Sequence, residues 1–362
     1  MSLTLPVEQI QGFILEKILR RKPAGPARPV VSMACHLGAS NIVLLTAETT
    51  AGKLRIKGLG VEPRPAEHAK ISDIIKAGHA FAGLETQKIR ISLKGQGVIV
   101  RFIQFPKMAP DELKSALSFE AESYIPFKMS EVVIDYHVLE DSVTTEKGEE
   151  MNILLIAVKK EEVYVQMKLF NDAGLEPDIV DCDILASVNA LEYFHPEDAA
   201  RSIAYLDLGN DSSSLCVLRA GKPRFIRDIS FGDLDVSKRF RRKLGLNSED
   251  ADKLMAASSM PSVEAEEALK ESYTSLATDL KVSLDYYLGQ VPQAIPVTKL
   301  FIGGGAGDTS LISPILSESL GIPVQTMDIL NKVDVDAGVD RNLLVSYAKL
   351  LPVCLGLCLR SE

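Results

Sequence analysis

Residues 203–230 read IAYLDLGNDSSSLCVLRAGKPRFIRDIS, and the plan of the whole chain can be worked out from this stretch. Apolar runs at 203–208, 214–219 and 224–229 have the length and composition of β-strands. Gly-Asn-Asp and Gly-Lys-Pro separate the runs, and glycine and asparagine favour turns because they tolerate positive φ. The stretch therefore predicts three consecutive strands joined by two tight turns.

The first of these turns carries residues suited to phosphate and magnesium. Successive backbone N–H groups and small hydroxyls in a turn can converge on one anion. Gly209, Asn210 and Ser212 are the residues placed to do this. Asp207, just before the turn, can hold Mg²⁺ through water, because that ion prefers oxygen ligands and keeps much of its hydration. Taken alone, the pattern fits an ordinary surface hairpin equally well.

A hairpin of the same layout lies roughly one domain earlier. Residues 31–46 read VSMACHLGASNIVLLT, again an apolar strand, Leu-Gly, small polar residues and a second apolar strand. Gly38 matches Gly209, and His36 falls where Asp207 does. A duplicated hairpin predicts two related lobes with a ligand between them. The phosphate-binding candidates in this copy are Gly38, Ala39, Ser40 and Asn41.

A glycine-rich segment completes the set. Residues 299–310, KLFIGGGAGDTS, predict a strand that runs through glycines into a helix N-terminus. Glycines at such a turn let the backbone approach a ligand closely, so Gly303, Gly304 and Gly305 are candidates for nucleotide contact. The order of the three motifs resembles the ATPase superfamily of actin, the heat-shock chaperones and the sugar kinases. This resemblance implies a two-lobed, duplicated α/β fold that binds ATP and Mg²⁺.

Composition restricts the class of protein further. The 362 residues carry a formal net charge of −9, which argues against a nucleic-acid partner because phosphate backbones need clustered Lys and Arg. Five cysteines without Cys-X-X-Cys spacing fit a reducing cytoplasm. No apolar run reaches the ~18–20 residues needed to cross a bilayer, so we expect no transmembrane segment.

The periodicity of apolar residues divides the chain. The expected regions are an N-terminal arm at 1–29, a first lobe at 30–96, 184–202 and 341–362, and a second lobe at 203–340 with a helical subdomain at about 233–295. From 97 to 183 the strand and helix patterns alternate as β-α-β-β-α-β, which predicts an α+β module inserted into the first lobe. Residues 263–288 place their apolar side chains on one stripe and predict a long helix facing the core.

Residues 119–136, FEAESYIPFKMSEVVIDY, carry a sharper resemblance. They are similar to a segment of the pilus assembly protein PilM family, the cytoplasmic actin-like component of type IV pilus machines. That family carries aromatic-Glu-Ala-Glu-X-Tyr-Ile-Pro-Phe followed by Glu-Val-Val-X-Asp-aromatic. Further similarities extend over roughly residues 30 to 360. The resemblance implies an FtsA-like arrangement, in which an inserted module replaces the one that actin carries.

The resemblance also implies a partner. PilM-like proteins bind the short cytoplasmic N-terminal peptide of the inner-membrane protein PilN, beside the inserted module. The candidate peptide-binding residues are Tyr124, Ile125, Pro126 and Phe127. Pro126 stops the preceding helix, and apolar side chains on such a bend can receive a peptide or, equally, seal the module against the lobe. The implied location is cytoplasmic and peripheral to the inner membrane, with pilus motor components as further candidate partners.

The chain departs from the family pattern at the expected catalytic centre. An acidic residue usually stands at the position of His36, and a neutral histidine cannot replace its charge beside Mg²⁺. Asp207 keeps its acid, and Asp181 and Asp183, two apart at a strand end, point the same way and can orient water. We therefore expect ATP binding with slow or absent hydrolysis. Two alternatives stay open, a small-molecule kinase of the same superfamily and a pseudo-ATPase scaffold without nucleotide.

Overall fold

The computed structural model describes residues 29–81, 88–146, 148–305 and 307–360. The expected N-terminal arm lies outside the described residues, apart from residue 29. The strands are β1 (Val30–Leu37), β2 (Asn41–Thr50), β3 (Lys53–Pro63), β4 (Lys88–Leu93), β5 (Val98–Pro106), β6 (Val132–Thr145), β7 (Gly148–Lys159), β8 (Glu176–Cys182), β9 (Ser202–Leu208), β10 (Ser213–Arg219), β11 (Lys222–Ile229), β12 (Leu300–Gly304), β13 (Val324–Thr326) and β14 (Asp334–Val335).

Helices follow the strands in alternating blocks, as expected for an α/β protein. They are α2 (His68–Phe81), α3 (Pro110–Glu120), α4 (Lys160–Asp172), α5 (Asp183–Phe194), α6 (Asp233–Leu244), α7 (Ser248–Met255), α8 (Val263–Gln290), α9 (Thr309–Leu320), α10 (Arg341–Ser346) and α11 (Leu351–Cys358).

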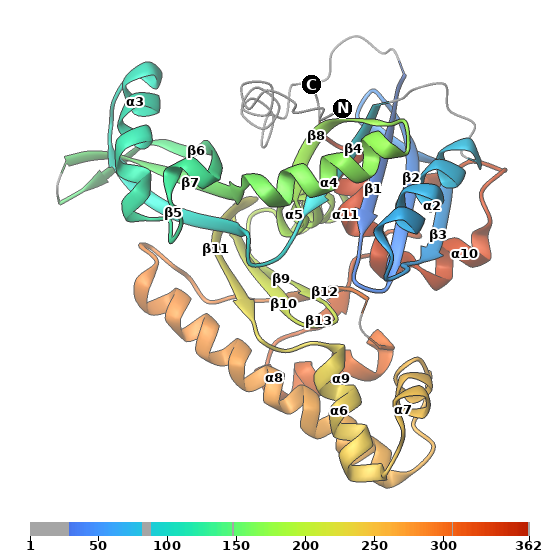
Figure 1. Ribbon diagram of the computed structural model, residues 1–362. Helices are drawn as coiled ribbons and strands as arrows, with labels where there is room; N and C mark the ends of the chain where they lie inside the picture. Colours follow the sequence, from blue (N-terminus) through green and yellow to red (C-terminus); the bar gives the residue numbers. More distant parts are fainter. Residues whose placement is uncertain (1–28, 82–87, 147, 306, 361–362) are drawn as a thin grey trace.

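Two sheets that share five strands in the same order, with β14 added at the edge of the first, form the centres of the two lobes (Figure 1). In the first lobe the order is β14-β3-β2-β1-β4-β8, and in the second lobe it is β11-β10-β9-β12-β13. Each lobe has three antiparallel strands in sequence, followed by two parallel strands beside the first of them. The hairpins β1–β2 and β9–β10 therefore occupy equivalent places, as the sequence repeat predicts.

The inserted module is smaller than the sequence predicts. Its antiparallel sheet, β5-β7-β6, packs on α3 around its own apolar core. The two remaining predicted elements, α4 and β8, belong to the first lobe. Strand β8 pairs in parallel with β4, and α4 lies against α2, where Ser72 Oγ donates to the carbonyl of Leu169 at 3.0 Å. The reason is that β8 is buried almost throughout and completes the first sheet as β13 completes the second.

The C-terminal segment closes the first lobe. Helix α11 packs against α5 and the first sheet, and its apolar side chains share one core with those of β1 and β2. Arg90 on β4 donates to the carbonyls of Leu357, Cys358 and Arg360, which satisfies groups left open at the helix end. Arg360 Nε in turn donates to Asp181 Oδ2 at 2.7 Å in a fully buried pair.

The second lobe is covered by its own helices. The long helix α8 begins at the capping residue Ser262, and its predicted apolar stripe, including Leu269, Tyr273, Leu276 and Leu280, is buried against the second sheet together with α6 and α9. Figure 1 shows α6, α7 and α8 extending away from the inserted module. Among the described residues, none of the helices combines the length and apolarity needed to span a membrane.

Candidate nucleotide-binding cleft

The three predicted motifs meet around one cleft between the lobes. A cavity of about 270 Å³ is lined by the β1–β2 turn, by the β9–β10 turn and by Gly304 and Gly305. A larger cavity of about 1060 Å³ shares part of this lining and extends along α6, the end of α7 and Gly303. Every residue predicted to hold nucleotide lines at least one of the two cavities. The motifs are therefore brought together as a single site.

The two hairpin turns are fixed from behind. Arg64 Nη1 donates to the carbonyls of Leu37 and Gly38 at 3.2 and 2.8 Å, which holds the first turn. The N–H groups of Asp233 and Leu234, at the start of α6, donate to the carbonyls of Gly209 and Asn210 at 3.1 and 3.0 Å. The second turn is thus joined to a helix N-terminus, where the partial positive charge of the helix favours an anion.

Two basic and two acidic side chains alternate at the floor of the smaller cavity. Lys94 Nζ is 2.5 Å from Asp207 Oδ2, and His36 Nδ1 is 3.5 Å from Asp183 Oδ2. Burial alone would lower the pKa of His36, but the carboxylates of Asp183 and Asp207 outweigh it, and the pKa is raised. Likewise, burial opposes ionisation of Asp183, yet His36 and Lys94 hold its pKa below the ordinary value. The two carboxylates thus make the charged form of His36 easier to reach than in a free imidazole.

Only two of the three predicted catalytic aspartates face the cleft. Asp207 and Asp183 line the smaller cavity, whereas Asp181 is 2% exposed and paired with Arg360 in the first-lobe core. The prediction that Asp181 and Asp183 point the same way is wrong, because β8 ends at Cys182 and Asp183 already begins α5. Side chains two apart share a face only while the strand continues.

Lys94 was not among the predicted site residues. It follows β4 directly, and β4 runs parallel to β1, so its carboxyl end lies at the same edge of the sheet as the first turn. Polar residues at this edge of a parallel pair are common ligand contacts. That position was the available signal in the sequence. The partner, Asp207, lies in the other lobe, and the pairing could not be read from the sequence.

The three glycines serve different purposes. A Cβ on Gly303 would lie 2.3 Å from the hydroxyl oxygen of Tyr205, and one on Gly304 would lie 2.3 Å from the carbonyl oxygen of Leu208. Gly304 also has a φ of +99°, which side chains rarely adopt. A Cβ on Gly305 meets only Leu350, at 3.8 Å. The first two glycines are therefore required by the packing of β12 on β9, and Gly305 is the one that borders open space.

The donors at the floor of the cleft do not fit Mg²⁺ held through Asp207. The ion requires oxygen ligands or ordered water beside a free carboxylate. Here Oδ2 of Asp207 already contacts an ammonium group, and Asp183 faces an imidazole with a raised pKa. Both carboxylates at the floor are therefore already partners of basic side chains, Lys94 and His36, rather than a vacant pair.

The predicted peptide-binding bend is partly core. Ile125 is 5% exposed and belongs to the apolar cluster of the inserted module, so it is removed from the candidate contacts. Pro126 is exposed, and Tyr124 and Phe127 are half-buried. Lys159 Nζ lies 4.5 Å from the centre of the Phe127 ring, a favourable cation–π contact. Three of the four candidates therefore keep accessible surface.

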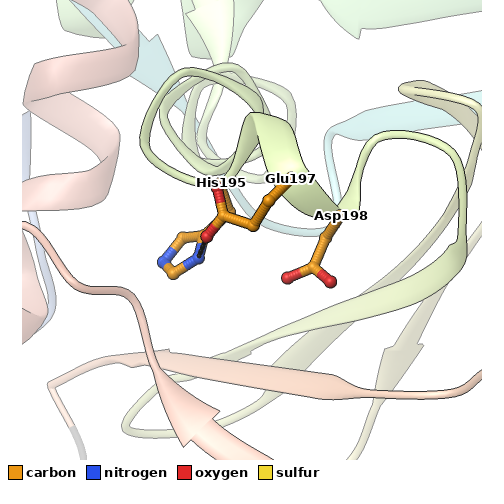
Figure 2. Close-up of side chains that lie close together, drawn as sticks. All are labelled: His195, Glu197 and Asp198. Atoms are coloured by element: carbon orange, nitrogen blue, oxygen red, sulfur yellow. Dashed lines mark hydrogen bonds and ion pairs between the residues drawn. The ribbon is translucent and has the colours of Figure 1, made fainter.

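Outside the cleft, the titratable side chains of His195, Glu197 and Asp198 lie close together just after α5 (Figure 2). His195 Nδ1 contacts Glu197 Oε1 at 3.0 Å, while its Nε2 accepts the N–H of Asp328 at 3.0 Å. Glu197 and Asp198 are also paired, with Lys332 at 2.8 Å and Lys299 at 2.7 Å respectively. Ligand atoms of His195, Glu197 and Asp198 lie close enough for a metal, but these contacts already satisfy them. The group is a structural connection.

The fold and the cleft define the class of protein. Two duplicated lobes, each with three antiparallel and two parallel central strands, and a turn-lined cleft between them constitute an actin-like fold. The family of Type IV pilus assembly protein PilM matches residues 35–362, and the chain belongs to that family.

Solved structures agree with this assignment. The chain is 26% identical to one described as a PilM-PilN type IV pilus biogenesis complex, with a TM-score of 0.78, covering 91% of this chain and 97% of that one. It is 14% identical to the ethanolamine utilization protein EutJ from Carboxydothermus hydrogenoformans, with a TM-score of 0.58, covering 98% of this chain and 97% of that one. The second likeness concerns the fold alone.

Proposed function

We propose that this protein is an actin-like platform of type IV pilus assembly that binds adenine nucleotide between its lobes. In this proposal it docks the N-terminal peptide of a PilN-like inner-membrane protein on its inserted module. The observation that carries the nucleotide part is the convergence of both hairpin turns and Gly305 on one cleft. The partner part is supported by family membership and by the PilM-PilN complex that the chain resembles.

The cleft can be divided by chemistry. The phosphates of ATP would lie between the two turns, where N–H groups and the hydroxyls of Ser40 and Ser212 are available. The base and ribose would extend past Gly305 into the larger cavity beside Ser237 and Met255. The volume of that cavity, about 1060 Å³, exceeds what a nucleoside requires.

Hydrolysis is proposed to be slow or absent. A general base must reach the attacking water with an available lone pair, and both carboxylates at the floor are paired with basic side chains instead. The same arrangement argues against the small-molecule kinase alternative, which needs an acidic base in the cleft. Binding without turnover fits a platform whose nucleotide has a structural or signalling purpose. The motor components of the pilus remain candidate partners.

The peptide would dock on the accessible part of the bend. Tyr124, Pro126 and Phe127 offer apolar surface beside the exposed residues Glu122 and Lys128. Burying two or three aliphatic side chains there would contribute about 1.5–3 kcal/mol each, before ordering costs. Micromolar affinity would follow from those magnitudes. This docking would place the protein on the cytoplasmic side of the inner membrane through its partner.

Isothermal titration with ATP and with a partner N-terminal peptide tests both parts. Gly305→Val, which meets no close neighbour, should weaken ATP binding at least tenfold while the protein stays folded and binds peptide normally. Phe127→Ala should weaken peptide binding about tenfold, or about 1.4 kcal/mol, and spare ATP. Tyr286→Ala, an exposed aromatic on α8, is the control for both.

The nucleotide part and the peptide part of the proposal can be disproved independently. Absence of ATP binding by the wild type at millimolar nucleotide would leave the pseudo-ATPase scaffold as the better account. If Phe127→Ala spares peptide affinity, the peptide docks elsewhere. A cavity of about 260 Å³ where the module meets both lobes, lined by Leu139, Leu185, Val188 and Leu359 among others, would then be examined first.

A further inference from the structure

We propose that Lys94 is the counter-ion of the nucleotide phosphates and that nucleotide binds in this cleft without a divalent metal ion. The inference rests on the proposed nucleotide-binding function and specifies its chemistry. It also accounts for the poor fit between the floor of the cleft and Mg²⁺.

Lys94 lies beside the turn that would receive the phosphates. Its Nζ lies 2.5 Å from Asp207 Oδ2, in front of the second turn, where a Cβ built on Gly209 would be only 3.1 Å away. The side chain is 31% exposed and lines the same cavity as both turns. The ammonium group therefore lies beside the backbone that would receive the phosphates, and it is accessible from the cleft.

Lys94 can contact Asp207 and a phosphate group at the same time. An ammonium group has three N–H donors, and one is used by Asp207. The remaining N–H groups can donate to phosphate oxygens, the role in which lysine acts as a point charge. Polyphosphate placed between the turns would thus meet Lys94 directly, with Asp207 holding the ammonium in position. The contact is between lobes, since Lys94 follows β4 and Asp207 ends β9.

The side chains around Asp207 disfavour a divalent ion at this carboxylate. A divalent ion at Asp207 would have to displace an ammonium at 2.5 Å, and it would then lie close to that cation. His36, beside Asp183, adds a further group that favours the charged form. The two basic and two acidic side chains of the floor already balance one another, so a divalent ion would compete with Lys94 for Asp207, whereas phosphate oxygens can contact the ammonium group directly. Lys94 thus supplies a positive charge beside the phosphates, at the place where a divalent ion would otherwise lie.

Nucleotide titrations in Mg²⁺ and in EDTA test the inference on the full chain. Wild-type affinity for ATP in EDTA should lie within about threefold of that in millimolar Mg²⁺. Lys94→Met, which keeps most of the side-chain length and removes the charge, should lose at least tenfold in EDTA and become Mg²⁺-dependent, because Asp207 is then free for the ion. Lys94→Arg should retain binding in EDTA.

Lys57→Met is the matched control. Lys57 Nζ also lies 2.5 Å from a carboxylate, Asp336 Oδ2, but at the outer edge of the first sheet and outside the cleft. It should bind ATP as the wild type does. Wild-type binding that requires Mg²⁺, or Lys94→Met binding unchanged in EDTA, overturns the inference and leaves the nucleotide function standing. Absence of ATP binding by the wild type in both buffers overturns the nucleotide function itself.

Discussion

The first and second lobes share five strands in the same order, but the ends of corresponding strands carry different residues. His36 on β1 stands where Asp207 stands on β9. Counting along the parallel partners from these two residues, Lys94 after β4 corresponds to Gly305 after β12. The duplication thus keeps backbone positions while the chemistry differs, because these two positions carry the basic side chains His36 and Lys94 in the first lobe and Asp207 and Gly305 in the second.

The lobes also differ in how their sheets are covered. The second lobe buries its sheet under helices from its own continuous stretch of chain. The first lobe depends on α11, which returns from the C-terminus and packs against α5 and the sheet. A helical glycine can be replaced with alanine in each lobe. Comparing the two variants separates the cost of crowding between packed helices from the intrinsic preference of alanine for a helix.

Gly356→Ala should have the largest effect. A Cβ on Gly356 of α11 would lie 1.7 Å from the carbonyl oxygen of Ala186 on α5, so the two helices would be forced apart. Overpacking of this kind costs about 3 kcal/mol or more, whereas alanine ordinarily stabilises a helix relative to glycine. Thermal unfolding and urea titration measure the loss.

Gly289→Ala in α8 is the control for this prediction. A Cβ at Gly289 meets nothing within 4 Å, so the same substitution should be neutral or stabilise by a few tenths of a kcal/mol. Equal effects at the two positions would contradict the view that the first lobe depends on the close contact between α11 and α5.

Features set by residues close together in the sequence could be predicted, whereas features set by distant residues could not. The hairpins, the glycine segment and the stripe of α8 are local patterns, and the structure has them where predicted. The placement of β8 needed tertiary information, because a short buried strand after a helix fits an inserted module and a parallel sheet equally well. The duplication offered a correction, since β8 is the counterpart of β13.

Contacts between side chains that lie far apart in the sequence could not be predicted. Asp181 and Arg360 are 179 positions apart, and their pairing removes one predicted catalytic residue from the site. Lys94 and Asp207 come from different lobes, so their contact depends on how the lobes pack together. The residues facing the cleft could be predicted from turns and glycines, but the charges that meet at its floor required the structure.

The inserted module is a further difference between the lobes, and it contains a buried carboxyl group, that of Asp135. This residue on β6 is 3% exposed, and burial raises its pKa to about 7, against an ordinary value of 3.8. The folded protein therefore keeps the proton while the unfolded chain loses it, and stability should fall as pH rises from about 4 to 7. Asp135→Asn should flatten this dependence and be about 2 kcal/mol more stable than the wild type at pH 8.

Melting temperatures from pH 4.5 to 8.5 check this prediction. The amide oxygen of asparagine can still accept the N–H of Tyr136, which Asp135 Oδ1 accepts at 2.8 Å. Parallel pH profiles for the wild type and the variant would show that the dependence arises outside the module.

The smallest expected effect comes from making the first hairpin resemble the second. His36→Asp replaces a basic imidazole with a carboxylate facing Asp183, whose Oδ2 is 3.5 Å from the present imidazole. Like charges at this range repel, so the variant should lose about 1 kcal/mol in EDTA, or about 2 °C in melting temperature. Two adjoining carboxylates are also a better site for a hydrated divalent ion, so millimolar Mg²⁺ should restore the loss by binding the folded state. Wild-type protein should show no such rescue, because its two carboxylates face Lys94 and His36. Differential scanning fluorimetry with Mg²⁺ and with EDTA compares the two proteins. A variant that melts at the same temperature in both buffers would mean that position 36 only packs the hairpin, and that the chemical difference between the lobes lies at Lys94 alone.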